Sequence, residues 1–289
     1  MKFFAILLAL AGMFFLWVRA PQSVLSRINV LVGTSPVSVW SWDKKQNTFT
    51  VLVIPSDYVV NGTDGYGKYS LDALWKLGFI DGKSGTVLTK SLEQTLAIPI
   101  PFYVGEKLDA LVFSSDVIDT GKKLFSPYIV GRNTTNMPIW KYIFFTWALR
   151  RARLDAIRVI DLSEKSVIIP EDLPDGTKRP VLDAGRLDAV LKGVYEDELL
   201  ASEGTTVAVY NTTTTPSLGT QAARMLTNLG IRVVAVGNAS PSRASCSLSG
   251  TRLATDTKTA AVIKALFSCD ILVNMQQERA DLTIHLGSD

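Results

Sequence analysis

The chain contains little histidine and cysteine, which limits the chemistry that it can support. Its one histidine, His285, stands close to the C-terminus, and its 2 cysteines are Cys246 and Cys269. Ser-His-Asp catalysis requires a histidine beside the nucleophile, and zinc sites require several Cys or His ligands at short spacings. The sequence offers neither arrangement. We therefore predict no triad and no zinc site, and we assign His285 no role.

Basic tracts are also missing. The chain has 30 Lys and Arg against 27 Asp and Glu, so its formal net charge is +3. Proteins that bind nucleic acids concentrate Lys and Arg on one face or in runs with interleaved aromatic residues. No such run occurs here, and we expect no nucleic-acid partner.

Long apolar runs are scarce, and the clearest one begins the chain. Phe3–Val18 carries no charged residue and is flanked by Lys2 and Arg19. A membrane span takes about 20 apolar residues, so this run is slightly short for a span and long for the core of a cleaved signal peptide. Pro21 should hinder a signal peptidase that cleaves after Ala20. We predict an uncleaved signal-anchor helix at residues 1–20, with a cleaved signal peptide as the alternative.

Either interpretation places residues 21–289 outside the cytoplasm. With the uncleaved anchor, the chain would be a single-pass protein of the cell membrane, with most of its residues in an oxidising compartment. Cys246 and Cys269 could pair there, and a disulfide that closes a loop of this length stabilises a protein by about 3 kcal/mol. Two free buried thiols are the alternative, and the sequence leaves both open.

The last third of the chain alternates between strand and helix patterns. Apolar residues alternate along the strands and recur at helical spacing along the helices. The predicted helices are Pro216–Leu229 and Thr257–Phe267. The predicted strands are Thr206–Asn211, Ile231–Gly237, Ile271–Asn274 and Leu282–Leu286. Two β-α-β passages within so short a segment predict a compact α/β domain at residues 205–289.

This segment resembles the LytR C-terminal domain, a module that follows LytR-CpsA-Psr domains in bacterial envelope proteins. The residues that match are Val207–Asn211, Gly219, Gln221–Leu229, Gly230–Asn238 and the closing Ala280–Asp289. They stand in the family's order and cover nearly all of the predicted domain. The resemblance implies a bacterial protein of the cell envelope.

The middle of the chain predicts a second α/β unit. Three strands are predicted at Ile28–Gly33, Val37–Trp42 and Thr48–Ile54. Two helices follow at Tyr69–Leu77 and Gly85–Leu96, and then a strand at Ile98–Val104. This order places helices over a sheet, as in an α/β sandwich. Further on, Glu171–Pro180 predicts a turn-rich loop and Leu187–Leu200 an amphipathic helix. The acids of that helix, Glu196, Asp197 and Glu198, are expected to form a solvated face.

Parts of this unit resemble a LytR-CpsA-Psr domain. Asn47–Asp57 resembles the strand and loop that carry the family's Ser-Ile-Pro-Arg-Asp-Thr signature, Gly67–Leu71 its Lys-(Ile/Leu)-Asn segment, and Ser91–Val104 its helix and next strand. The resemblance implies such a domain at residues 21–200. Members of the family transfer glycopolymers from a polyprenyl-pyrophosphate carrier to peptidoglycan with the help of a divalent metal.

Two positions depart from the family's pattern. Ser56 stands in place of the signature arginine, and Ser35-Pro36 stands where the family has an acidic metal ligand. Arginine binds pyrophosphate through two hydrogen bonds, and phosphoryl transfer depends on such charges. Asp57 and Lys68 are retained. We therefore expect a degenerate member that binds or scaffolds during cell-wall glycopolymer assembly without catalysis.

The alternative is a working phosphotransferase with displaced residues. It would hold Mg²⁺ with Asp57 and the polyprenyl phosphate with Lys68 and one of the arginines Arg150, Arg151 or Arg153. Without catalysis we expect no cofactor. A membrane-tethered spacer with no ligand is a third class of function. The expected partners are the cell membrane and, beyond it, a polyprenyl-phosphate lipid, a cell-wall polymer or other envelope proteins.

A dense aromatic segment precedes these arginines. Ile139–Leu149 (IWKYIFFTWAL) is too short to cross a bilayer. We favour a core helix whose C-terminus is stabilised by the cations that follow it. A helix that lines a lipid pocket or lies on the membrane, with its arginines toward phosphates, is the alternative.

Overall fold

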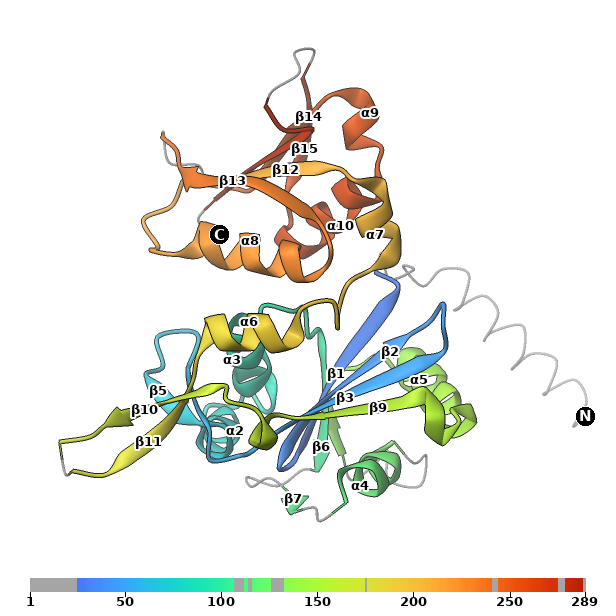
Figure 1. Ribbon diagram of the computed structural model, residues 1–289, viewed down its shortest axis with the longest axis vertical. Coiled ribbons are helices and arrows are strands. Elements are labelled where there is room, and N and C mark those ends of the chain that lie inside the picture. Colours follow the sequence, from blue (N-terminus) through green and yellow to red (C-terminus); the bar gives the residue numbers. More distant parts are fainter. Residues whose placement is uncertain are drawn as a thin grey trace, which may run out of the picture.

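The protein is described by a computed structural model that covers residues 25–106, 112–113, 116–125, 133–174, 176–240, 244–274 and 279–287. The predicted signal-anchor at residues 1–20 lies outside these residues. Within them, every helix is too short or too polar to cross a bilayer. The fold is mixed α/β with three mixed sheets. Figure 1 shows two lobes, a larger one that contains β1 to β11 and a smaller one that contains β12 to β16.

The larger lobe is built on a central sheet whose two faces are both buried. The strand order is β8 (Asn133–Thr135), β6 (Phe102–Glu106), β1 (Arg27–Ser35), β2 (Val37–Asp43), β3 (Thr48–Ile54) and β9 (Ile157–Asp161), and β7 (Val112–Phe113) also pairs with β1. Strands β1, β2 and β3 form an antiparallel meander. Because side chains alternate along a strand, Leu31 enters one hydrophobic core while Val30 and Val32 enter the other.

Helices cover each face of this sheet. On one face lie α2 (Leu71–Ile80), α3 (Thr86–Leu96) and α6 (Ala184–Leu191); on the other lie α4 (Val117–Leu124) and α5 (Ile139–Arg151). The helix predicted at Tyr69–Leu77 starts later, because Lys68–Ser70 forms the short strand β5. Two 3₁₀ turns, η2 (Leu154–Ala156) and η3 (Leu162–Glu164), flank β9.

A second, smaller sheet extends from the edge of the larger lobe. Its order is β10 (Ile168–Asp172), β11 (Lys178–Leu182), β4 (Val59–Asn61) and β5 (Lys68–Ser70). The prediction of a loop at Glu171–Pro180 is therefore wrong at both ends of this segment. The two ends belong to β10 and β11, which pair as a β-hairpin. Only its centre turns, and Gly176 there has a φ of 80°.

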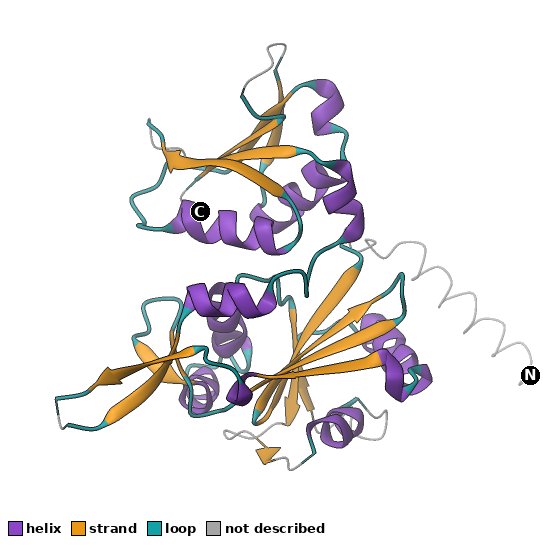
Figure 2. Cartoon of the chain, viewed as in Figure 1, coloured by secondary structure: helices purple, strands orange, loops and turns teal. Residues whose placement is uncertain are grey.

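The smaller lobe contains two β-α-β passages. The first uses the predicted segments, and the second begins at the unpredicted strand Ser247–Gly250 rather than at Ile231–Gly237. The first is β12 (Thr206–Asn211), α8 (Leu218–Asn228) and β13 (Arg232–Asn238); the second is β14 (Ser247–Gly250), α9 (Arg252–Thr255), α10 (Lys258–Phe267) and β15 (Asp270–Val273). Strand β16 (Leu282–Leu286) pairs with β12 and β14 at the centre of the sheet. Cys246 and Cys269 form a disulfide with Cα atoms 4.4 Å apart, just before β14 and β15. In Figure 2, α8 lies on the side of this sheet that faces the larger lobe.

The helix predicted at Leu187–Leu200 is divided in two. Helix α6 ends at Leu191, and α7 (Glu198–Glu203) begins after a turn in which Gly193 has a φ of 73°. The predicted solvated face is also wrong for Asp197, which caps α7 through the N–H of Leu199 and is buried.

Candidate functional site

The two positions that depart from the family's pattern meet at one end of the central sheet. Ser35 ends β1, and Ser56 follows β3. Their hydroxyl oxygens lie 2.8 Å apart, within hydrogen-bond distance. Both side chains are neutral and partly exposed. The resemblance implies an arginine and an acidic residue at this end of the sheet. The pairing of the strands places two serine hydroxyls there.

The N-terminus of α2 closes over the same loop. The N–H of Asp72 donates to the Ser56 carbonyl and the N–H of Leu71 to the Tyr58 carbonyl, each at 3.1 Å. The first N–H groups of a helix have no intrahelical partner and often bind anions. Here the loop's own carbonyls occupy two of them, which leaves fewer donors for a phosphate.

Asp57 is exposed beside this loop. Burial of the Tyr58 phenol, together with the charges of Asp57 and Asp161, raises the pKa of Tyr58. Asp161 ends β9 and accepts a hydrogen bond from the N–H of Ser163. Within the described part of the chain, no three His, Cys, Asp or Glu side chains gather into a group that could hold a metal ion. The residues at the Ser35–Ser56 contact therefore do not fit a divalent metal.

Lys68 lies away from this loop, on β5. Its Nζ is 2.6 Å from the Glu171 carboxylate, and Arg179 Nε is 2.7 Å from the other oxygen of the same carboxylate. Hydrogen bonds from Lys68 and Arg179 hold the pKa of Glu171 below its usual value. Lys68 thus forms an ion pair that links β5 and β10, the two edge strands of the smaller sheet.

The three arginines lie at the end of α5, across the central sheet from β5 (Figure 1). The Arg151 guanidinium is 4.1 Å from the centre of the Trp147 ring, and Arg153 pairs with Asp155 at 3.1 Å. Arg150 lines a cavity of about 260 Å³ next to α4. The structure therefore does not bring Asp57, Lys68 and these arginines into one pocket.

The space between α2 and the central sheet is filled by Trp75, which is fully buried. An added Cβ at Gly33, Gly85 or Gly105 would come within 2.5 to 2.9 Å of this ring or of a neighbouring aromatic ring. Because Gly33 and Gly105 carry no side chains, the end of the indole ring fits against the backbone there.

A cleft that the sequence does not predict lies between the two lobes. Its volume is about 340 Å³, and its lining residues come from α3, the α10 end, β16 and α8: Lys90, Glu93, Gln94, Ala97, Leu218, Gln221, Ala222, Met225, Phe267 and Leu286. Burial raises the pKa of Glu93, whose carboxylate accepts a hydrogen bond from the N–H of Ile100. Its two walls are more than a hundred residues apart in the sequence, so no local motif marks this cleft.

Polar contacts fix the lobes to each other beside this cleft. Arg224 of α8 binds the Asp188 carboxylate through Nε at 2.7 Å and Nη2 at 2.8 Å. Asn228 donates to the carbonyls of Leu96 and Ala97 at the end of α3. These contacts hold α8 against α3 and α6.

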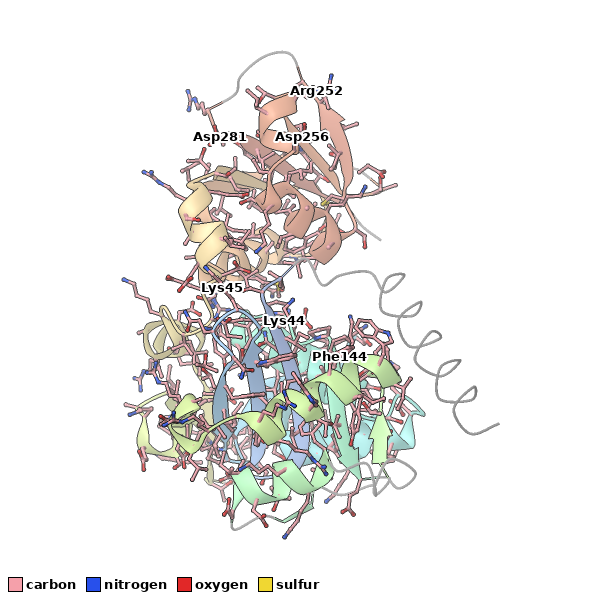
Figure 3. The ribbon with its side chains drawn as sticks, turned by 90° about the vertical axis from the view of Figure 1, so that its right-hand side faces the viewer. Lys44, Lys45, Phe144, Arg252, Asp256 and Asp281 are labelled. Carbon is pink, nitrogen blue, oxygen red and sulfur yellow. A yellow bond between two sulfur atoms is a disulfide. The ribbon has the colours of Figure 1, made fainter. Side chains whose placement is uncertain are left out.

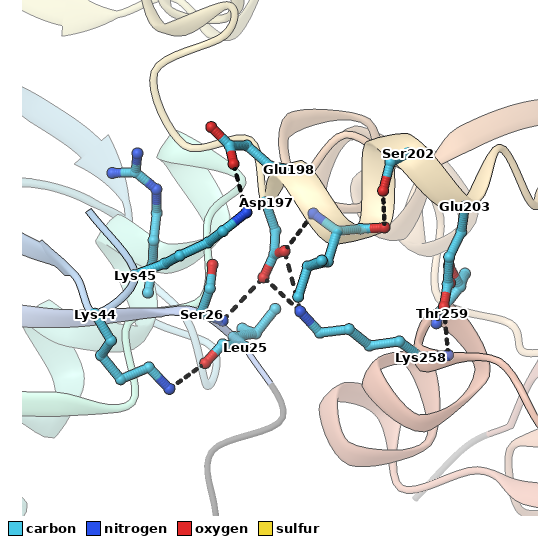
Figure 4. Close-up of polar contacts among 12 residues, drawn as sticks. Leu25, Ser26, Lys44, Lys45, Asp197, Glu198, Ser202, Glu203, Lys258 and Thr259 are labelled. Atoms are coloured by element: carbon cyan, nitrogen blue, oxygen red, sulfur yellow. Dashed lines mark hydrogen bonds and ion pairs between the residues drawn. The ribbon is translucent and has the colours of Figure 1, made fainter. Parts of the chain in front are cut away.

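A second junction surrounds Asp197. Both of its carboxylate oxygens lie 3.1 Å from Lys258 Nζ, and one accepts the N–H of Ser26 at 2.9 Å. Figure 4 shows how this carboxylate joins the start of β1, the start of α7 and the start of α10. The sequence places these segments far apart, and the buried carboxylate binds all three.

Comparisons with known proteins give matches in both lobes. Residues 204–289 match the family model described as LytR cell envelope-related transcriptional attenuator. No curated protein matches the chain. Among solved structures, YwtF from Bacillus subtilis is 14% identical with a TM-score of 0.43, over 71% of this chain and 91% of that chain.

Two further structures are similar at the same level. TagV from B. subtilis is 15% identical with a TM-score of 0.39, over 57% of this chain and 94% of that chain. A LytR-CPS2A-psr family protein, YwtF (TagT) with bound octaprenyl pyrophosphate lipid, is 14% identical with a TM-score of 0.40, over 60% of this chain and 90% of that chain. The family match at the C-terminus agrees with the order of strands and helices in the smaller lobe, and residues 204–289 form a LytR C-terminal domain.

Proposed function

We propose that this chain is a membrane-anchored, non-catalytic relative of the LytR-CpsA-Psr proteins that binds or scaffolds during cell-wall glycopolymer assembly. In this proposal residues 1–20 anchor the chain, residues 21–200 form the degenerate domain, and residues 205–289 form the C-terminal domain. The bulk of the chain then acts outside the cytoplasm, where the disulfide between Cys246 and Cys269 is stable.

The contact between Ser35 and Ser56 is the observation that carries the proposal. Transfer of a phosphoryl group needs cations on the developing negative charge and a held metal ion. The hydroxyls of these two serines, 2.8 Å apart, carry no charge. The place where the resemblance implies a metal and an arginine therefore supplies neither.

The competing function is a phosphotransferase that uses Asp57, Lys68 and an arginine from the end of α5. Its one support is that Asp57 and Lys68 match the family's pattern. Such an enzyme needs these groups around one pyrophosphate, yet Lys68 pairs with Glu171, and Arg150 lies across the central sheet. The geometry favours the non-catalytic function.

Native mass spectrometry of the full chain, extracted from a bacterial membrane, tests the proposal. We expect the protein without a polyprenyl-pyrophosphate adduct, also after incubation with octaprenyl pyrophosphate and Mg²⁺. An adduct that requires Mg²⁺, and that disappears in Asp57→Asn, would overturn the proposal in favour of the enzyme. Asp256→Asn, which removes an exposed carboxylate in the smaller lobe, is the matched control.

A further inference from the structure

Helix α5 is apolar on both of its faces, although only one face enters the core. Tyr142, Phe145, Ala148 and Leu149 pack beneath it in the core. On the outer face Ile139, Ile143 and Trp147 are exposed to 57%, 43% and 52%. Residues four apart share one face of a helix, so these three side chains form a continuous apolar stripe.

An apolar stripe of this kind needs a partner. A helix that is hydrophobic all round is normally covered on every side, and large exposed apolar patches mark interaction surfaces. Trp140 and Phe144 stand beside the stripe and are partly exposed. Figure 3 looks onto this side of the molecule, with α5 crossing it and Phe144 labelled.

The charges around the stripe are positive. Helix α5 contains no acidic residue and ends in Arg150 and Arg151, with Arg153 two residues further on. The Arg151 guanidinium lies over the Trp147 ring. Helices that lie in a membrane surface combine large apolar residues and tryptophan with arginines that reach the lipid phosphates.

A small cationic cavity adjoins the last turn of the helix. It is lined by Lys122, Lys123, Phe125, Thr146, Leu149 and Arg150 and has a volume of about 260 Å³. The Thr146 hydroxyl is buried and has no hydrogen-bond partner among the described residues. One of the lysines, Lys123, also pairs with Asp119. Three cations and an unsatisfied hydroxyl around an apolar floor suit the phosphate of an anionic lipid.

The helix also lies near the point where the described chain begins. Lys44 Nζ donates to the Leu25 carbonyl at 2.6 Å, and Figure 3 places Lys44 close to α5. Burial lowers the pKa of Lys44, and the positive charges of Lys258 and of Lys141 on α5 lower it further. The sequence before Leu25 contains the apolar run Phe3–Val18.

We propose that the outer face of α5 lies on the lipid surface of the membrane. The stripe Ile139–Ile143–Trp147 contacts the acyl boundary, and Arg150, Arg151 and the adjoining cavity bind the phosphates of anionic lipids. The inference rests on the proposed function, because an anchor at residues 1–20 would hold this side of the larger lobe near the bilayer.

Site-directed fluorescence on the full chain in lipid vesicles tests the inference. Both native cysteines are paired, so one added cysteine carries the only label. Ile143→Cys places the label in the stripe. Ile80→Cys is the matched control, because Ile80 is 75% exposed on α2, across the central sheet. We expect nitroxide-bearing lipids to quench the label at position 143 and to leave the label at position 80 unquenched.

The lipid composition and the arginines provide a second measurement. Quenching should be stronger with phosphatidylglycerol than with phosphatidylcholine alone. In the Ile143→Cys chain, Arg150→Gln and Arg151→Gln should each weaken the contact by about five-fold, the usual effect of one basic residue at an anionic surface. Equal quenching of the two labels would overturn the inference. So would a dimer in solution, linked through position 143, without lipid quenching.

Alkaline extraction separates the inference from the proposed function. A chain that resists extraction but shows no quenching at position 143 is anchored without contact through α5, and only the inference fails. A chain that is extracted has no anchor, and the proposed anchoring fails. Quenching at position 143 before that extraction would still support the contact through α5.

Discussion

At the scale of single residues, Asp197 connects more of the molecule than any local pattern suggests. Its carboxylate is 2% exposed and binds Lys258, the N–H of Ser26 and the N–H of Leu199. Burial alone would raise its pKa, but the hydrogen bonds from Ser26 and the ammonium of Lys258 outweigh burial and lower the pKa. One side chain thus ties the first strand to the C-terminal domain.

Removing this charge should destabilise the folded chain. We expect Asp197→Asn to lower the free energy of unfolding by about 2 to 3 kcal/mol, because Lys258 loses its buried partner. Glu198→Gln is the control: Glu198 pairs with Lys45 in solvent, with exposures of 57% and 58%, and its loss should change the free energy of unfolding much less. Urea unfolding of both variants measures the difference, and equal losses would contradict this role.

The lowered pKa also sets the pH at which Asp197 stabilises the fold. Its contribution is present above the carboxyl's pKa in the unfolded chain, about 3.9, and is lost as the pH falls through the lower pKa of the folded state. The stability difference between the native chain and Asp197→Asn should therefore be constant near neutral pH and shrink in acid.

The disulfide between Cys246 and Cys269 acts on the smaller lobe alone. It closes a loop with a sequence separation of 23 residues, and a loop of that size corresponds to about 3 kcal/mol. Reduction should lower the melting temperature, and Cys246→Ser with Cys269→Ser should reproduce the shift without reductant. Two thiols that react freely in the unfolded, oxidised protein would contradict the pairing.

At the scale of helices and strands, Trp75 determines how α2 meets the sheet. A Cβ at Gly105 would come 2.5 Å from the Trp75 ring. We expect Gly105→Ala to destabilise the protein by about 2 kcal/mol through overpacking. Gly185→Ala, where a Cβ has ordinary contact distances in α6, should be neutral or slightly stabilising.

A smaller ring at position 75 tests the same contact. Trp75→Phe should reduce the loss caused by Gly105→Ala, and thermal unfolding of the double-mutant cycle measures the coupling. Additive effects of the two substitutions would mean that the ring and the glycine are independent.

The sequence predicts elements well where the local pattern is strong. Strands β12 and β16 have the predicted bounds, and β3 does as well. Strand β14 is missed, because Ser247–Gly250 has one large apolar side chain and becomes a strand by pairing with β15 and β16. The helix predicted at Leu187–Leu200 fails at Gly193, whose left-handed backbone interrupts it.

The candidate site, too, depends on contacts between residues that are distant in the sequence, and local patterns do not predict such contacts. The resemblance identifies Ser35 and Ser56 separately, while their contact depends on β1 and β3 ending at the same edge of the central sheet, with β2 between them. The pairing of Lys68 with Glu171 and the burial of Asp197 arise from residues distant in the sequence. The outer face of α5 is visible only once its inner face is known, because the helix is apolar on both.

At the scale of the whole molecule, the lobes are joined by specific polar contacts beside an apolar cleft. Arg224 contributes most of them: it binds Asp188 twice and donates to the carbonyls of Thr95 and Ala184 at 3.2 and 3.4 Å. Such contacts favour one arrangement of the lobes over others.

Loss of the Arg224 side chain should weaken the contact between the two lobes. We expect Arg224→Gln to separate the unfolding of the lobes into two calorimetric transitions and to speed proteolysis between α6 and α7, at residues 192–197. Arg232→Gln, on the exposed edge strand β13, should leave both unchanged. A single unchanged transition in Arg224→Gln would show that other contacts hold the lobes.

Hydrolysis of octaprenyl pyrophosphate by the full chain, with and without Mg²⁺, separates a scaffold from an enzyme and is followed as release of inorganic phosphate. Because Ser35 and Ser56 supply neither a metal ligand nor a cation, we expect no phosphate release above the rate without protein. Release that depends on Mg²⁺ and is abolished by Asp57→Asn would contradict this expectation, and the chain would then be an enzyme.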